Sequence, residues 1–200
     1  MKNIYLISGN EGKLREFRSI IPQVKNIRLE LDEIQSLDPI KIIEHKLNSA
    51  KNKLNNEGIN FDYIIVEDTS LFIDSLNGLP GPFIKFFLKS IDNDGICKIV
   101  NSYSQNINAS AKTFIGLIDK EGLTNFFEGE IKGKISKEPR GENGFGWDKI
   151  FIPNGSNKTF AQMPSDEKNN ISMRKIAIER LKEFFCNNNK ILNNAQTKHT

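Results

Sequence analysis

The chain has 200 residues, of which 38% are hydrophobic and 26% charged, proportions typical of soluble globular proteins. Its 28 basic and 25 acidic residues leave a net charge of only +3 and are dispersed along the sequence, which argues against a general affinity for nucleic acid. No apolar run approaches the roughly 20 residues of a membrane-spanning helix, and the first apolar run is too short for a signal peptide. We therefore expect a cytoplasmic protein that binds neither nucleic acid nor membranes.

The first third of the chain predicts alternating strands and helices. Residues 3–7 are an apolar run typical of a buried strand, and apolar residues at helical spacing follow the turn at residues 8–10. A second strand is expected near residues 27–31. A helix is expected from Asp38 to about residue 54, because Asp38 can cap it and Pro39 suits its first position.

The remaining elements favour a mixed sheet. Residues 63–66 predict a third strand that ends in the acidic pair Glu67-Asp68. We expect further helices starting at Pro82, near residue 95 and at Ser165, and a hairpin of two long strands over residues 109–118 and 123–135. The expected fold class is α/β, with a single domain over residues 1–186 and a disordered, Asn-rich tail over residues 187–200.

The first turn has the composition of a phosphate-binding loop. Ser8, Gly9, Asn10, Glu11, Gly12 and Lys13 lie between a strand and a helix, where backbone N–H groups and the helix N-terminus can hold phosphate. The segment is no Walker A loop, because Ile7 and Leu14 stand where that motif needs Gly and Ser or Thr. Taken alone, the segment is better explained by an ordinary glycine turn with a solvated lysine, because short glycine motifs match by chance.

Carboxylates after the third expected strand suggest a metal site. Asp68 and its neighbours Glu67 and Thr69 occupy a position where Asp commonly binds Mg²⁺ together with phosphate oxygens. The same residues could instead cap a helix or a turn. Glu33, after the second expected strand, could be an isolated surface acid.

Two segments rich in glycine could form the rest of a nucleotide site. Residues 77–85 combine a constrained loop with a helix start that would present Lys85 to an anion, although a connector before an aromatic helix would look similar. Phe145, Gly146, Trp147 and Asp148 could stack on a nucleobase and accept hydrogen bonds from its ring N–H groups, whereas a lone Trp is more often part of a core. Near the last helix, Lys168 and Ser172 share a face by their spacing, and Arg174 lies off it.

These segments together resemble the inosine triphosphate pyrophosphatase family, most closely its eukaryotic members. The resemblance runs from residue 3 to residue 185 and rests on segments in a fixed order, which are Ser8-Gly9-Asn10 through Lys13, Glu67-Asp68-Thr69-Ser70, residues 76–85, Phe145-Gly146-Trp147-Asp148, Thr159-Phe160-Ala161, and Glu167-Lys168-Asn169 through Ser172 and Arg174. It implies an elongated mixed sheet with flanking helices, two lobes around a central cleft, and a homodimer. The implied reaction is Mg²⁺-dependent hydrolysis of ITP, dITP or XTP to the monophosphate and pyrophosphate, with Mn²⁺ as an alternative metal.

The resemblance also implies a role for each matching residue. Residues 8–13 would hold the triphosphate, and Lys46, Lys85 and Lys168 would neutralise phosphate charge. Glu33 and Asp68 would bind the metal, and Asp68 would also orient or deprotonate the attacking water. Phe145 and Trp147 would form the base pocket, with Asp148 and Arg174 at its polar edge.

Two residues depart from the family pattern. Met173 stands where the family usually has histidine, and Gln162 where it has glutamate. Donors that face the 6-position of the base would favour a keto group over the amino group of adenine, so the loss of a histidine donor could weaken this selection. Arg174 and backbone N–H groups would then carry it. Two alternatives stay open, namely a pyrophosphatase for another modified nucleotide and a nucleotide-binding regulator with weakened turnover.

Overall fold

The computed structural model describes residues 2–196 and gives the burial of residues 2–187. Its helices are α1 (Glu11–Ile20), α2 (Pro39–Asn56), α3 (Ile84–Tyr103), α4 (Ser165–Ile171) and α5 (Met173–Gln196), with short 3-10 helices η1 (Asp74–Leu76), η2 (Gly146–Lys149) and η3 (Phe160–Gln162). Its strands are β1 (Ile4–Ile7), β2 (Lys25–Ile27), β3 (Tyr63–Ile73), β4 (Pro80–Gly81), β5 (Asn108–Asp119), β6 (Thr124–Ile135) and β7 (Phe151–Pro153). Within residues 2–196, no helix is both long and apolar enough to span a membrane.

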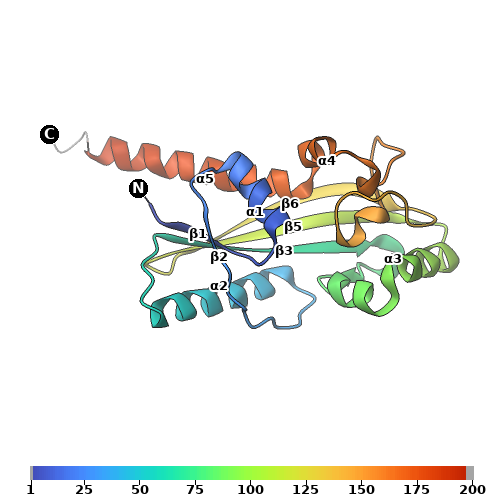
Figure 1. Cartoon of the computed structure of the whole chain (residues 1–200), viewed down its shortest axis with the longest axis horizontal. Helices are drawn as coiled ribbons and strands as arrows, with labels where there is room; N and C mark the ends of the chain where they lie inside the picture. Colours follow the sequence, from blue (N-terminus) through green and yellow to red (C-terminus); the bar gives the residue numbers. More distant parts are fainter. Residues whose placement is uncertain (1, 197–200) are drawn as a thin grey trace.

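The strands form one mixed sheet, which confirms the expected fold class. Their order is β2-β1-β3-β5-β6-β7, with β4 added to β3 (Figure 1). β1 is parallel to both β2 and β3, whereas β3, β5, β6 and β7 are successively antiparallel. The predicted hairpin is present as β5 and β6, and its turn is closed by the Asp119 carboxylate, which accepts from the N–H groups of Gly122 and Leu123 at 2.8 Å.

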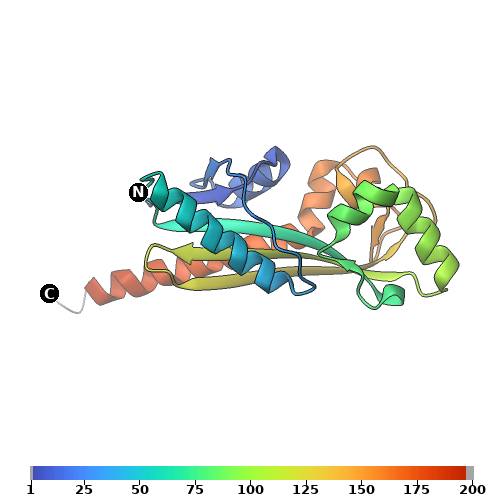
Figure 2. The same cartoon turned by 90° about the horizontal axis from the view of Figure 1, so that it is seen from below.

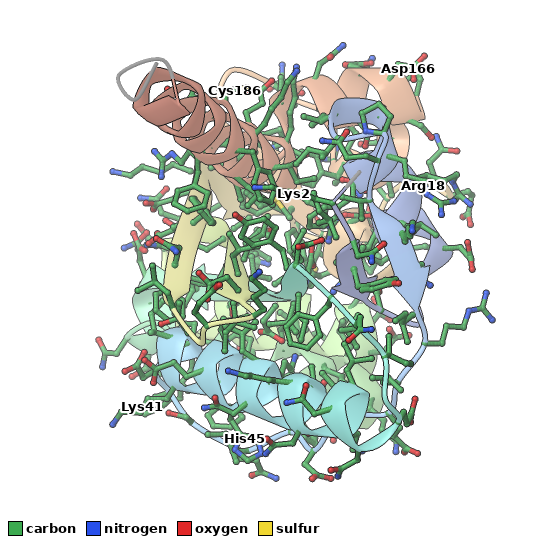
Figure 3. All side chains as sticks on the ribbon, turned by 90° about the vertical axis from the view of Figure 1, so that its left-hand side faces the viewer. Lys2, Arg18, Lys41, His45, Asp166 and Cys186 are labelled. Atoms are coloured by element: carbon green, nitrogen blue, oxygen red, sulfur yellow. The ribbon has the colours of Figure 1, made fainter. Side chains whose placement is uncertain are left out.

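Helices cover both faces of the sheet in an elongated molecule (Figures 1 and 2). When the molecule is viewed down its long axis, α2 lies on one side of the sheet and α5 on the other (Figure 3). Lys41 and His45 mark α2 in this view, and Cys186 marks α5. Each of these layers encloses its own apolar core, one between α2 and the sheet and one between α1, α5 and the sheet. We call this part the proximal lobe.

A second lobe lies at the other end of the long axis, next to α3 and α4 (Figure 2). Its apolar core contains Ile96 and Val100 of α3 together with Trp147, Phe151 and Phe160. We call this part the distal lobe. β3 and β5 contribute residues to the cores of both lobes, so the same strands run through the whole molecule.

Local sequence explains where α2 lies and how it begins. The Asp38 carboxylate accepts from the N–H of Ile40 at 2.9 Å, and Pro39 occupies the first helical turn, as predicted. Its buried face includes Ile43 and Leu47, which pack against the sheet, and it also carries the buried Lys46. The helix therefore points one lysine toward the sheet from an otherwise apolar face.

The prediction that the third strand ends in Glu67-Asp68 was wrong. β3 continues to Ile73 and stays paired with β5 along its whole length. The acidic pair does not end the strand because both carboxylates find cationic partners, and because the following residues, Thr-Ser-Leu-Phe-Ile, are good strand formers. Both carboxylates therefore lie in the middle of a rigid element.

Four other elements, β2, β7, α3 and α5, differ from the predictions. β2 ends at Ile27, where the second strand was expected to begin, and β7 was not predicted. The two helices expected between residues 82 and 103 are one element, α3, with a break in its backbone at Asp92. α5 continues to Gln196, past the expected domain boundary at residue 186, and residues 197–200 lie outside the described residues, so the disorder of the tail stays a prediction.

Candidate functional site

A cavity of about 620 Å³ lies where the two lobes meet. Its wall is built from separate stretches of the chain, which are residues 7–10 and 13, part of the connection before α2, two residues of α2, residues 66–69, residues 82–86 and 88, residues 145–148, and residues 168, 173 and 174. Most of the predicted site lines it, namely Ser8, Gly9, Asn10, Lys13, Glu33, Lys46, Asp68, Thr69, Lys85, Phe145, Gly146, Trp147, Asp148, Lys168, Met173 and Arg174. The structure thus gathers residues that lie far apart in the sequence around one space.

Three predicted site residues do not line the cavity. Glu11 pairs with Arg28 at the surface, and Gly12 lies within the first turn of α1. Ser172 is buried at the break between α4 and α5, where its hydroxyl accepts from the N–H of Lys175 at 3.1 Å. These three residues shape the elements next to the cavity.

The predicted phosphate loop is held by its own hydrogen bonds. The Asn10 side chain accepts from the N–H groups of Gly12 and Lys13 at 2.8 and 3.2 Å, and the Ser8 hydroxyl accepts from the N–H of Asn10 at 3.1 Å. Asn10 is therefore the N-cap of α1, and it uses two of the backbone donors that a phosphate could have taken. What this loop presents to the cavity is Ser8, Gly9, Asn10 and the ammonium group of Lys13.

Glu33 and Asp68 meet at one ammonium group. Lys46 Nζ lies 2.7 Å from Asp68 Oδ1 and 3.2 Å from Glu33 Oε1, and Lys85 Nζ lies 3.2 Å from the other Glu33 oxygen. Burial alone would lower the pKa of Lys46, but the negative charges of Asp68 and Glu33 outweigh it and raise this pKa. Burial would raise the pKa of Glu33, and the two lysines lower it instead. Glu33 and Lys46 are therefore both charged at neutral pH.

This pair of carboxylates fits a hard divalent cation. Carboxylate oxygens from two sides converge on a single positive group, the arrangement that a Mg²⁺ or Mn²⁺ ion uses when water and phosphate oxygens complete its coordination. Among the described residues, no three His, Cys, Asp or Glu side chains gather in a metal-binding group. The chain alone therefore offers a site that a substrate would have to complete.

Glu67 is a member of the site that the sequence reasoning did not assign. Its carboxylate lies 2.7 Å from Lys13 Nζ and 2.7 Å from Arg174 Nε, and it accepts from the Thr69 hydroxyl at 3.0 Å. Arg174 also contacts Glu16 of α1 at 2.9 Å. The strand period could have revealed this, because residues 67 and 69 share one face of a strand and residue 68 lies on the other.

The surroundings of Glu67 keep it ionised. Burial alone would raise its pKa, but the charges of Arg174 and Lys13, with their hydrogen bonds, outweigh burial and lower the pKa to about 2. In the same cluster, burial would lower the pKa of Arg174, and the carboxylates of Glu67 and Glu16 raise it. The ion pair of Glu67 and Arg174 thus joins β3 to α5, and their contacts with Lys13 and Glu16 connect both to α1.

The distal side of the cavity is aromatic with one acid. The Asp148 carboxylate accepts from Lys168 Nζ at 2.6 Å and from the N–H of Phe145 at 2.7 Å. Lys168 Nζ also lies 5.0 Å from the centre of the Phe145 ring. Because Gly144 has a φ of 75° and a Cβ there would lie 2.1 Å from Asp148, only glycine allows this close turn.

The two aromatic residues of this segment differ in exposure. The Phe145 side chain is exposed, with a residue exposure of 46%, whereas Trp147 is 6% exposed and packs edge-on against Phe151 in the distal core. Phe145 is thus the ring with a free surface for stacking, and Trp147 forms the wall behind it. Trp147 was predicted either to contact a base or to belong to a core. In the structure it lines the cavity and also belongs to the distal core.

The break before α5 explains the unusual spacing of Lys168 and Arg174. Ser172 has extended backbone angles between α4 and α5, so Lys168 and Arg174 belong to different helices and reach the cavity from different directions. Met173 is 3% exposed and faces both the cavity and the distal core. Gln162 does not line the cavity, and its side chain accepts from the N–H of Thr159 at 3.0 Å.

A sequence profile of the Ham1 family matches residues 4–184. The chain belongs to the Ham1 family. Among its relatives, the dITP/XTP pyrophosphatase of Methanopyrus kandleri is 36% identical over 189 residues, which cover 92% of this chain and 97% of that protein. The inosine triphosphate pyrophosphatase of Candida glabrata is 39% identical over 191 residues, which cover 91% of this chain and 96% of that protein. These relatives confirm the resemblance found in the sequence.

Solved structures of Ham1 proteins share the fold. The Ham1 protein from Coxiella burnetii is 25% identical with a TM-score of 0.81, and the Staphylococcus aureus Ham1 protein is 27% identical with a TM-score of 0.74. Each comparison covers 94% of this chain and 100% of the other chain. The two-lobed architecture is therefore common to this chain and to these Ham1 proteins.

The wall of this Ham1-family cavity carries nearly balanced charge. Its five lysine and arginine side chains stand against four aspartate and glutamate side chains, which leaves one net positive charge. Each of the five cations forms an ion pair with an aspartate or glutamate that also lines the cavity. Arg174 has a further partner, Glu16, which does not line the cavity. A strongly anionic ligand can bind here only if it exchanges partners with these pairs or brings a cation with it.

Proposed function

We propose that this chain hydrolyses deaminated purine nucleoside triphosphates, namely ITP, dITP and XTP, to the monophosphate and pyrophosphate. One observation carries the proposal. A single cavity joins a carboxylate pair and its partner lysines on one side to an exposed aromatic ring beside a buried acid on the other. Membership of the Ham1 family and the printed activities of its relatives support the same reaction.

Mg²⁺ is the metal that we assign to this reaction, with Mn²⁺ as an alternative. Glu33 and Asp68 would hold it, and its charge would stabilise the phosphate oxygens in the transition state. The nearly neutral wall supports this assignment, because the chain alone cannot balance the charge of a triphosphate. Lys46 and Lys85, which pair with the two carboxylates, would then be free to contact phosphate oxygens.

Asp68 is our candidate for orienting or deprotonating the attacking water. The water oxygen forms a bond to the α-phosphorus while the bond from that phosphorus to the α-β bridging oxygen breaks, so pyrophosphate leaves with the bridging oxygen. Lys13 and Lys168 lie on the cavity wall where they can neutralise charge on the triphosphate. Such placement needs little covalent chemistry from the protein, because rigid charges and dipoles lower the barrier.

The purine would stack on Phe145 with its polar edge toward Asp148 and Lys168. Arg174 was expected at this edge, but its guanidinium donates to Glu67, Glu16 and Thr69. A direct contact from Arg174 to the base therefore requires at least one of these bonds to open. Selection of a 6-keto base over adenine stays a prediction.

The deciding experiment incubates the protein with ITP, XTP, GTP and ATP in Mg²⁺ and measures pyrophosphate and orthophosphate separately. We expect pyrophosphate from ITP and XTP, with a higher kcat/KM than for ATP, and no release after chelation of the metal. In water labelled with ¹⁸O, the label should enter the monophosphate. Orthophosphate as the only product, or label in pyrophosphate, would overturn the reaction.

The same panel separates the alternatives. Equal kcat/KM for ATP and ITP would contradict the proposed base selection. Turnover of other modified nucleotides in preference to ITP would identify a different housekeeping substrate. Binding of ITP without pyrophosphate release would identify a regulator that has lost turnover. We further propose that the protein is a cytoplasmic homodimer, which light scattering would test as a particle of twice the chain mass.

A further inference from the structure

We call residues 145–148 the base side of the cavity. A residue of α3, Asn93, holds this segment from the side that faces away from the cavity. Asn93 Nδ2 donates to the carbonyl oxygen of Gly146 at 3.0 Å, while on the other side Asp148 accepts from the N–H of Phe145 at 2.7 Å. The peptide group before Phe145 and the peptide group between Gly146 and Trp147 are therefore both held, and Phe145 lies between them. Gly146 has a φ of 63°, a conformation that glycine adopts readily and that residues with a Cβ rarely adopt.

The backbone break in α3 occurs directly before Asn93. Asp92 has a φ of 55° and a ψ of −177°, and its carboxylate accepts from the N–H of Asn93 at 2.7 Å. α3 resumes at Asn93 and packs against η2, which contains Gly146. Asn93 is 8% exposed and lies outside the wall of the cavity. The break at Asp92 thus places the buried amide of Asn93 against the Gly146 carbonyl.

The hydrogen bonding of Asn93 indicates that its Nδ2 donor, rather than its Oδ1 acceptor, has a structural role. Within the described residues, its Oδ1 atom is buried and has no hydrogen-bond partner. A buried acceptor without a partner costs stability, which an apolar side chain of similar size would avoid. Packing alone therefore gives no reason for an amide at residue 93, whereas the bond to Gly146 does. Gly146 is exposed, so this bond restrains a loop that lies at the surface.

We propose that Asn93 is a positioning residue that sets the orientation of Phe145 and so the affinity for the base. Assigning that affinity to a purine rests on the proposed function. The role links two parts of one substrate site, because α3 presents Lys85 to the cavity in its first turn and Asn93 to η2 after the break. Loss of the amide should weaken binding of the base and leave the phosphate side unchanged.

The first test needs no substrate, because Trp147 is the only tryptophan of the chain and follows Gly146 directly. Asn93→Leu removes the donor at similar volume, and Asn93→Asp places a carboxylate oxygen against the Gly146 carbonyl. We expect acrylamide quenching of Trp147 fluorescence to rise about twofold or more in both variants, as the loop opens locally. If Asn93→Leu fails to fold, Asn93→Asp carries the test.

Asn101→Leu is the matched control. Asn101 lies on the same helix, and its amide also donates to backbone carbonyl groups, those of Cys97 and Ser136, away from the cavity. Its loss should leave Trp147 quenching at the wild-type value. Quenching that is unchanged in both Asn93 variants, or that rises equally in Asn101→Leu, would overturn the proposal.

The second test separates the base side from the phosphate side. With ITP, the Asn93 variants should raise KM about 3- to 30-fold and keep kcat within about twofold, the pattern of lost substrate positioning. Inhibition by pyrophosphate should stay at the wild-type level. A fall in kcat at unchanged KM, or weaker inhibition by pyrophosphate, would contradict a base-side role. Absence of ITP turnover in the wild type would overturn the proposed function, and the fluorescence test would still decide whether Asn93 holds the loop.

Discussion

At the scale of single residues, the site is a set of ion pairs in which each partner depends on the other. Glu67 shows this most clearly, because its carboxylate is almost fully buried and contacts both Lys13 and Arg174. Breaking a buried pair leaves the other charge without compensation, which costs more than the pair itself contributes. The network is therefore more sensitive to the loss of one member than its distances alone suggest.

Glu67→Gln should lower the free energy of unfolding by about 3–5 kcal/mol at pH 7, since it removes the carboxylate partner of Lys13 and leaves the buried Arg174 with Glu16 alone. The folded pKa of Glu67, about 2, lies below its ordinary value of 4.5. The stabilisation by its charge is therefore present above about pH 4.5 and is lost as the pH falls toward 2. Urea unfolding of wild type and variant at several pH values measures this. A stability difference that does not shrink on acidification would contradict it.

Asp68→Asn should reduce kcat for ITP by about 10²-fold or more, as expected for the loss of one preorganised catalytic group. Lys46 keeps Glu33 as a partner and the new amide is isosteric, so the fold should persist. Pyrophosphate release and the thermal midpoint measure the two effects. Thr69→Ser, a conservative change next to Asp68, serves as the control and should keep activity near wild type. Normal turnover in Asp68→Asn would remove Asp68 from the mechanism.

The members of the site could largely be read from the sequence, but their partners could not. Lys46, Asp68 and Asp148 were found as residue types in a recognisable order. The ion pairs of Glu67 and the role of Asn93 were not predicted, because they depend on partners far away in the sequence, Arg174 in one case and Gly146 in the other. Such pairings join residues far apart in sequence and leave no local pattern.

At the scale of elements, boundaries were predicted well where local chemistry sets them. α2 begins at the Asp38 cap, and the hairpin turns at Asp119 and Gly122. β3 was cut short because acidic residues normally disfavour a strand, and only tertiary partners allow it to continue to Ile73. The sequence contains one sign of the break at Ser172. In a continuous helix Arg174 would lie off the face that carries Lys168, and the break explains how both residues reach the cavity.

The start of α5 depends on one glycine of β6. A Cβ at Gly129 would lie 1.9 Å from the carbonyl oxygen of Met173, which is backbone and cannot rotate away. Gly129→Ala should therefore destabilise the fold by about 1–3 kcal/mol, and it should raise KM because α5 carries Arg174 into the cavity. Urea unfolding and ITP kinetics measure both effects.

Gly116→Ala is the comparison for this prediction. Its Cβ would meet side-chain atoms of Ile43 and Leu47, at 2.3 and 2.8 Å, rather than backbone. Side chains can change rotamer, so the loss of stability should be smaller than in Gly129→Ala. If the two variants lose equal stability, rigid backbone contact does not determine how α5 is placed.

At the scale of the whole molecule, α5 contributes to the proximal core through residues that precede the predicted tail. Its buried residues Ala177, Ile178, Leu181 and Phe185 all precede residue 187. Deletion of residues 187–200 should leave the thermal midpoint and kcat/KM close to wild type, because this Asn-rich segment has few large apolar residues to bury. Truncation at residue 180, which removes Leu181 and Phe185, is the destabilising comparison. A large loss of stability in the shorter deletion would show that the tail has a structural role.

The strands that pass through both lobes have a thermodynamic consequence. β3 and β5 remain paired from Tyr63 to Ile73, and their residues enter the core of the proximal lobe at one end and that of the distal lobe at the other. Melting of one lobe alone would leave half of each strand without its packing, so the two lobes should unfold as one cooperative unit with equal calorimetric and van't Hoff enthalpies. A nucleotide bound in the cleft would then protect the entire chain, including surfaces far from its own contacts.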